Sequence, residues 1–105
     1  MKEINVKELK KKIENKEDFQ LIDVREEFEY QDANLGGELI PLGSILLEVD
    51  KISKDKDVVI HCRSGKRSAA AIMQLEQQFG FNNLYNLQGG IIAWAEEIDP
   101  SIQVS

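Results

Sequence analysis

The stretch VVIHCRSGKRS, residues 58–68, joins a predicted strand to a predicted helix and decides the fold. Its first four residues, Val58–His61, are mostly apolar and β-branched, which favours a short buried strand. The pattern then changes to helical spacing, with one face formed by Ser68, Ile72, Leu75 and Phe79. Cys62, the single cysteine, therefore lies at the carboxyl end of the strand, where a loop containing Gly65 leads into the helix.

The same alternation of strand and helix extends in both directions from this stretch. The other predicted strands are a short one ending at Ile4, then Phe19–Val24, Leu39–Leu42 and Leu84–Leu87. The other predicted helices are Val6–Glu14, Glu26–Tyr30, Ile45–Val49 and one that follows Gly89-Gly90 and ends before Pro100. Strands separated by helices predict an α/β fold with a central parallel β-sheet flanked by helices on both faces. Ligands of such sheets bind beyond the carboxyl ends of the strands.

Two helix ends carry specific sequence signals. Asn5 is a predicted N-cap, and Glu8 three residues later completes the pattern of a capping box. Gly80 follows the helix after Cys62 and predicts a left-handed C-terminal stop.

Composition limits the class of protein. The 105 residues suit one domain, residues 1–105, and 42% of them are hydrophobic, which argues against disorder. The net charge of −6 argues against binding to nucleic acid or to an anionic membrane. One cysteine and one histidine exclude an internal disulfide and make a zinc site improbable, so we expect no metal and no cofactor. Without a secretory signal or an apolar run of about 20 residues, a cytoplasmic location is expected.

Cys62 has the sequence surroundings of a reactive thiolate. A helix N-terminus offers partial positive charge and unpaired N–H groups, and Arg63, Lys66 and Arg67 add three formal charges. Gly65 and Ser64 allow the backbone to curl so that its N–H groups point inward. Such a setting stabilises the thiolate over the thiol, so we expect a nucleophile that is ionised at neutral pH. The alternative is an inert, buried structural cysteine.

His61 is the neighbour of this cysteine but points to the opposite face of the strand. We therefore interpret His61 as a packed or hydrogen-bonded structural residue, in preference to a general base for Cys62.

The segment Cys62–Ser68 resembles the active-site loop of the rhodanese family. Flanking segments resemble family signatures in the same order, and they are Leu21–Glu26, Ile40–Leu42, Gly80–Leu84 and Leu87–Trp94. The resemblance covers nearly the whole chain and implies the rhodanese fold. It also implies a sulfurtransferase in which Cys62 carries sulfane sulfur as a persulfide, with neither metal nor cofactor. The loop residues that would bind a small anionic donor such as thiosulfate are Arg63, Ser64, Gly65, Lys66, Arg67 and Ser68.

The resemblance leaves several assignments open. It suggests a supporting role for Asp23 and Arg25, at the end of another strand on the same sheet edge, although a simple strand-end salt bridge is an equal alternative. The loop Ala33–Leu39 lacks the histidine that many members carry there, which bears on substrate access and on the choice of a donor or acceptor protein.

Two other functions compete with sulfur transfer. One is a Cys-based phosphatase or arsenate reductase, but four residues separate Cys62 from Arg67, one fewer than in phosphatases of this kind. The family relationship implies that the shorter loop fits a sulfur atom better than a phosphate. The other is a persulfide carrier or docking module that does not act as an enzyme.

Overall fold

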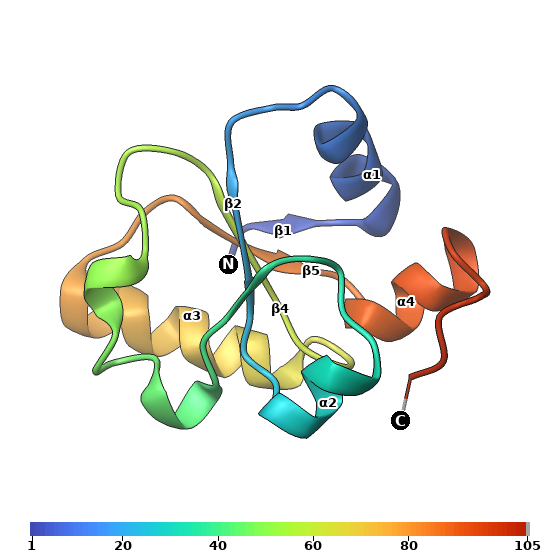
Figure 1. Ribbon diagram of the computed structural model, residues 1–105. Helices are drawn as coiled ribbons and strands as arrows, with labels where there is room; N and C mark the ends of the chain where they lie inside the picture. Colours follow the sequence, from blue (N-terminus) through green and yellow to red (C-terminus); the bar gives the residue numbers. More distant parts are fainter. Residues whose placement is uncertain (105) are drawn as a thin grey trace.

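The computed structural model describes residues 1–104; Ser105, the last residue of the predicted domain, lies outside the described residues (Figure 1). The strands are β1 (Glu3–Ile4), β2 (Gln20–Asp23), β3 (Glu38–Leu39), β4 (Val58–His61) and β5 (Leu84–Leu87). The α-helices are α1 (Val6–Glu14), α2 (Glu27–Asp32), α3 (Lys66–Phe79) and α4 (Gly90–Glu97), with 3₁₀ turns η1 (Leu42–Ser44) and η2 (Val49–Lys51). No helix within residues 1–104 is long and apolar enough to cross a membrane.

The strands form one parallel sheet in the order β1-β5-β4-β2-β3, with β4 at its centre. The register places Asp23 of β2 opposite His61 of β4, and Asn86 of β5 opposite Ile60. Since all strands run the same way, their carboxyl ends meet at one edge, beside Cys62. The predicted α/β class with a central parallel sheet is confirmed.

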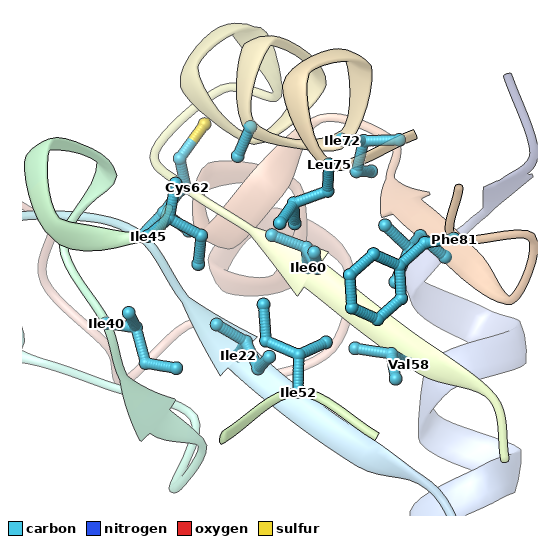
Figure 2. Close-up of a cluster of buried hydrophobic side chains, with 13 residues drawn as sticks. Ile22, Ile40, Ile45, Ile52, Val58, Ile60, Cys62, Ile72, Leu75 and Phe81 are labelled. Atoms are coloured by element: carbon cyan, nitrogen blue, oxygen red, sulfur yellow. The ribbon is translucent and has the colours of Figure 1, made fainter. Parts of the chain in front are cut away.

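Alternating side chains of β4 fill two separate apolar cores. Val58 and Ile60 face the core covered by α3 and the 3₁₀ turns, which Figure 2 shows in close-up. Val59 faces the other core, which α1 and α4 cover (Figure 1). Strands buried on both faces explain why β4 reads as a continuous apolar run. The helices cover both faces, as predicted.

The helix and strand ends with strong local signals agree with the sequence. The bounds of α1, β4 and β5 match the prediction. The Asn5 side chain accepts the Glu8 N–H at 2.8 Å, and the Glu8 carboxylate accepts the Asn5 N–H at 3.1 Å, which completes the capping box. Gly80 takes a left-handed φ of 70° and ends α3.

The segment between β3 and β4 differs from the prediction. The strand predicted over Leu39–Leu42 is shorter and begins one residue earlier, as Glu38–Leu39, and Pro41 is the N-cap of η1. The α-helix predicted over Ile45–Val49 is wrong, since residues 45–48 form turns and Val49 begins η2. Phe79, predicted on the same face of α3 as Ser68, Ile72 and Leu75, is 38% exposed, whereas the other three are buried.

Candidate active site

Cys62 directly follows the central strand and is 1% exposed. Its side chain belongs to the buried core that also contains Ile45 and Ile60 (Figure 2). The chain then turns within three residues, and Gly65 precedes α3 with a φ of 108°, a conformation that side-chain-bearing residues rarely adopt. This tight turn directs the start of α3 back toward the sulfur.

The Cys62 sulfur is surrounded by hydrogen-bond donors. The Gly65 N–H donates to Sγ at 3.1 Å and the Ser68 N–H at 3.4 Å. The Ser68 Oγ also lies 3.4 Å from Sγ. Two amides from one loop therefore converge on one atom, which forms a compact anion cradle at a helix N-terminus.

These contacts decide the ionisation of the thiol. Burial raises the pKa of Cys62, but hydrogen bonds from the Ser68 hydroxyl and from the amides of Ser68, Gly65 and Ser64 lower it further than burial raises it. The pKa of Cys62 therefore lies below its ordinary value, in the direction that the sequence predicts. The charged arginine and lysine side chains are not needed for this conclusion.

Asn86 fixes the loop from the neighbouring strand, β5. Its Oδ1 accepts the Ser68 hydroxyl at 2.5 Å, and its Nδ2 donates to the Gly65 carbonyl at 3.1 Å. The Ser68 hydroxyl carries one proton, so it donates either to Asn86 or to Sγ. A thiolate is the stronger acceptor because its charge assists the bond, so ionisation of Cys62 draws this proton toward the sulfur.

The N-terminus of α4 holds the loop from the other side. The N–H groups of Ile91 and Ile92 donate to the carbonyls of Cys62 and Arg63 at 3.0 and 3.2 Å. A side chain at Gly90 would collide with the same two carbonyls, and its φ is 60°. The Gly89-Gly90 pair therefore permits a close approach of two backbones in addition to starting a helix.

The loop cations do not share one environment. Arg63 and Lys66 are exposed, whereas Arg67 is partly buried and forms two hydrogen bonds with Glu29 of α2. The Arg67 Nη1 lies 2.7 Å from Glu29 Oε1, and Nη2 lies 2.9 Å from Oε2. This bond to Arg67 lowers the pKa of Glu29 to about 2 despite burial.

Asp23 and Arg25 meet at the same sheet edge but bond to each other. The Arg25 Nη2 lies 2.8 Å from Asp23 Oδ2, and Nε lies 3.0 Å from Oδ1. Nη2 also donates to the Ala33 carbonyl at 2.7 Å. Asp23 therefore pairs with Arg25 in a buried strand-end salt bridge. Arg67 pairs with Glu29.

His61 is fully buried on the face of β4 that is turned away from Cys62. Its Nε2 lies 3.8 Å from Asp23 Oδ2, beyond hydrogen-bond distance, and neither ring nitrogen has a hydrogen-bond partner among residues 1–104. Burial lowers the pKa of His61, and the Asp23 charge opposes this only in part. The ring is therefore neutral and packed, in agreement with a structural role.

Sequence reasoning missed two residues of this site. Asn86 was detectable as a polar residue on a buried strand that neighbours the cysteine strand. Glu29 was not, because nothing in the sequence separates it from Glu26 and Glu27. No group of three or more potential metal ligands occurs among residues 1–104.

A surface hollow of about 320 Å³ lies elsewhere, beside the start of β2. Its lining residues are Phe19, Gln20, Asp50, Lys51, Ile52, Ser53 and Lys56. None of them belongs to the Cys62 loop, and β2 and β4 begin at the sheet edge opposite to the cysteine. Shape alone therefore does not point to Cys62, whereas the hydrogen-bond donors around its sulfur do.

Comparisons with known proteins agree with this geometry. The family model "Rhodanese-like domain" matches residues 5–97. A sulfurtransferase of Allochromatium vinosum is 42% identical over 89% of this chain and 87% of that protein. YtwF of Bacillus subtilis is 40% identical over 95% of this chain and 96% of that protein. The crystal structure of a rhodanese-like domain protein from Staphylococcus aureus superposes with a TM-score of 0.83, at 30% identity over 100% of this chain and 99% of that one. The chain belongs to the rhodanese-like domain family.

Proposed function

We propose that this protein is a sulfurtransferase that moves sulfane sulfur from a small anionic donor such as thiosulfate, or from a persulfide donor, to a thiophilic acceptor. The proposal rests on one observation above all. The Gly65 and Ser68 amides are directed at the Cys62 sulfur, so the same cradle suits a thiolate and the terminal sulfur of a persulfide. The sulfurtransferase relative of Allochromatium vinosum supports the same reaction type.

The first half-reaction loads the cysteine. The Cys62 thiolate attacks the outer sulfur of thiosulfate, the S–S bond breaks, and sulfite leaves with the bonding electrons. Cys62 then carries a persulfide anion. Charge is conserved, because a thiolate and a dianion become a persulfide anion and sulfite. The loop amides stabilise the negative charge on sulfur before and after the transfer.

The second half-reaction unloads the cysteine. A thiophilic acceptor attacks the outer sulfur, and the Cys62 thiolate leaves. Cyanide serves as the acceptor in an assay, and a thiol or the cysteine of an acceptor protein takes this role in the cell. Such a cycle requires a reduced cysteine, so a reducing compartment such as the cytoplasm suits it.

Mass spectrometry of the intact chain tests the proposal directly. Thiosulfate should add one sulfur atom, ~32 Da, to the wild-type chain, and cyanide or dithiothreitol should remove it because both accept sulfane sulfur. Cys62→Ser should gain nothing, whereas Ser101→Ala, at an exposed position outside the Cys62 loop, should gain the same mass as the wild type. An unmodified wild-type chain, or a serine variant with the added mass, contradicts the proposal.

The length of the loop provides a second test. Four residues separate Cys62 from Arg67, and an extra glycine between Gly65 and Arg67 should widen the cradle and lower thiosulfate turnover. The unmodified protein should not hydrolyse a small aryl phosphate at a comparable rate. Phosphate hydrolysis that rivals thiosulfate turnover would replace sulfur transfer with phosphatase chemistry.

A further inference from the structure

Glu29 brings a fixed negative charge to the active-site loop. Both of its carboxylate oxygens accept hydrogen bonds from Arg67, at 2.7 and 2.9 Å. The side chain of Glu29 is 9% exposed and that of Arg67 is 34% exposed. Glu29 is also anchored at the start of α2, because its Oε1 accepts the Glu26 N–H at 3.0 Å. The carboxylate is therefore held in one position.

This pairing changes what Arg67 can offer to a substrate. A guanidinium that donates to both oxygens of a carboxylate has its best bidentate edge occupied. The pair also has no net charge, so it attracts a dianion less than an unpaired arginine would. Arg67 nevertheless belongs to the cradle of the sulfur, since it directly precedes Ser68, whose N–H donates to Cys62 Sγ at 3.4 Å.

We propose that Glu29 is a specificity-determining residue that lowers the preference of the loop for dianionic sulfur donors and so favours singly charged ones. The proposal rests on the sulfurtransferase function proposed above. It predicts that donor charge, at constant reaction chemistry, decides how efficiently Cys62 is loaded.

Two donors isolate the effect of charge. Thiosulfate is a dianion and releases sulfite, whereas methanethiosulfonate is a monoanion and releases methanesulfinate. In each case the Cys62 thiolate attacks the outer sulfur, the S–S bond breaks, and the leaving group takes the electron pair. The ratio of the two kcat/KM values therefore reports on charge selectivity and cancels changes in the amount of active protein.

Glu29→Gln should raise this ratio, thiosulfate over thiosulfonate, by about threefold to tenfold at low ionic strength, the size expected for one partly screened charge. The rise should shrink in high salt. Glu27→Gln is the matched control, because Glu27 lies on the same helix and its carboxylate accepts a hydrogen bond from Gln31. This control should leave the ratio unchanged.

Arg67→Gln provides a variant with the opposite expectation. It leaves the Glu29 carboxylate without its counter-charge, so the ratio should fall below that of the wild type. A general structural defect would not move the ratio in opposite directions in the two variants. An unchanged ratio in Glu29→Gln, or a fall in it, overturns the proposal. Uptake of ~32 Da by the wild-type chain from either donor separates this failure from a failure of sulfur transfer itself.

Discussion

His61 and Cys62 are neighbours in the chain, yet they lie in opposite chemical environments. Both are almost completely inaccessible to solvent. Cys62 faces the start of α3, where two amides donate to its sulfur and the Ser68 hydroxyl lies 3.4 Å from it. His61 faces the other side of the sheet, where its ring nitrogens have no hydrogen-bond partner among the described residues.

The difference shows what burial does and what it leaves undecided. Burial favours the neutral form of both groups, so alone it would raise the pKa of Cys62 and lower that of His61. Only Cys62 has enough donors to reverse the effect of burial. The end of one strand therefore supports an anionic sulfur on one face and a neutral imidazole on the other.

The largest expected effect on stability comes from Asp23, which lies opposite His61 in the sheet. Asp23→Asn removes the charge that compensates buried Arg25 and should reduce the free energy of unfolding by about 3–5 kcal/mol, the usual cost of breaking a buried ion pair. Urea unfolding measures this loss. Asp50→Asn, at an exposed position, should change it by less than about 0.5 kcal/mol. If Asp23→Asn also lowered the free energy of unfolding by less than about 0.5 kcal/mol, the Asp23–Arg25 salt bridge would not stabilise the fold.

On the cysteine side, Ser68→Ala should raise the pKa of Cys62, because the thiolate loses a hydroxyl donor while both amides remain. The pH dependence of alkylation by iodoacetamide measures this pKa. The exposed Ser64 side chain offers a control, and Ser64→Ala should leave the pKa unchanged. Equal pKa values in the wild type and the Ser68 variant would assign the ionisation to the amides alone.

Acid should weaken the contribution of the Glu29–Arg67 pair to stability. The folded pKa of Glu29, about 2, lies below its usual value of 4.5, so the pair stabilises the fold above pH 4.5 and loses this contribution as pH falls toward 2. We expect a loss of about 1–2 kcal/mol, reduced by solvent around the partly exposed Arg67. Comparing urea unfolding of the wild type and Glu29→Gln at pH 5 and pH 3 tests this. The two proteins should differ less at pH 3 than at pH 5, and an equal difference at both pH values would contradict it.

Local signals explain how much of this structure the sequence predicts. The cap at Asn5, the left-handed Gly80 and the apolar run of β4 each depend on residues within a few positions, and all three predictions are confirmed. The direction of the pKa shift of Cys62 also follows from one loop. The turns after Leu42 are harder to predict, because their apolar residues pack against α3 without forming a regular helix.

The partners within the site depend on contacts between distant segments. Glu29 meets Arg67 only after α2 and α3 have packed, and Asn86 meets Ser68 only because β5 pairs with β4. The sequence places three cations near Cys62 but does not reveal that one of them, Arg67, pairs with the carboxylate of Glu29. Composition near a motif therefore predicts which charges are present, whereas the fold decides which partners they meet.

The smallest effect on the pKa of Cys62 is expected for His61→Gln. This variant is the most direct test of the contrast between His61 and Cys62. His61 is neutral, lies on the opposite face of β4 and makes no hydrogen bond that reaches the sulfur among the described residues. Its replacement should therefore leave the alkylation pKa of Cys62 largely unchanged, even if packing losses reduce stability by about 1–3 kcal/mol. The comparison is made with folded protein, verified by circular dichroism. A folded His61 variant that loses the reactive thiolate, alongside a Ser68→Ala variant that keeps it, would replace the amide cradle with a Cys–His pair as the source of reactivity.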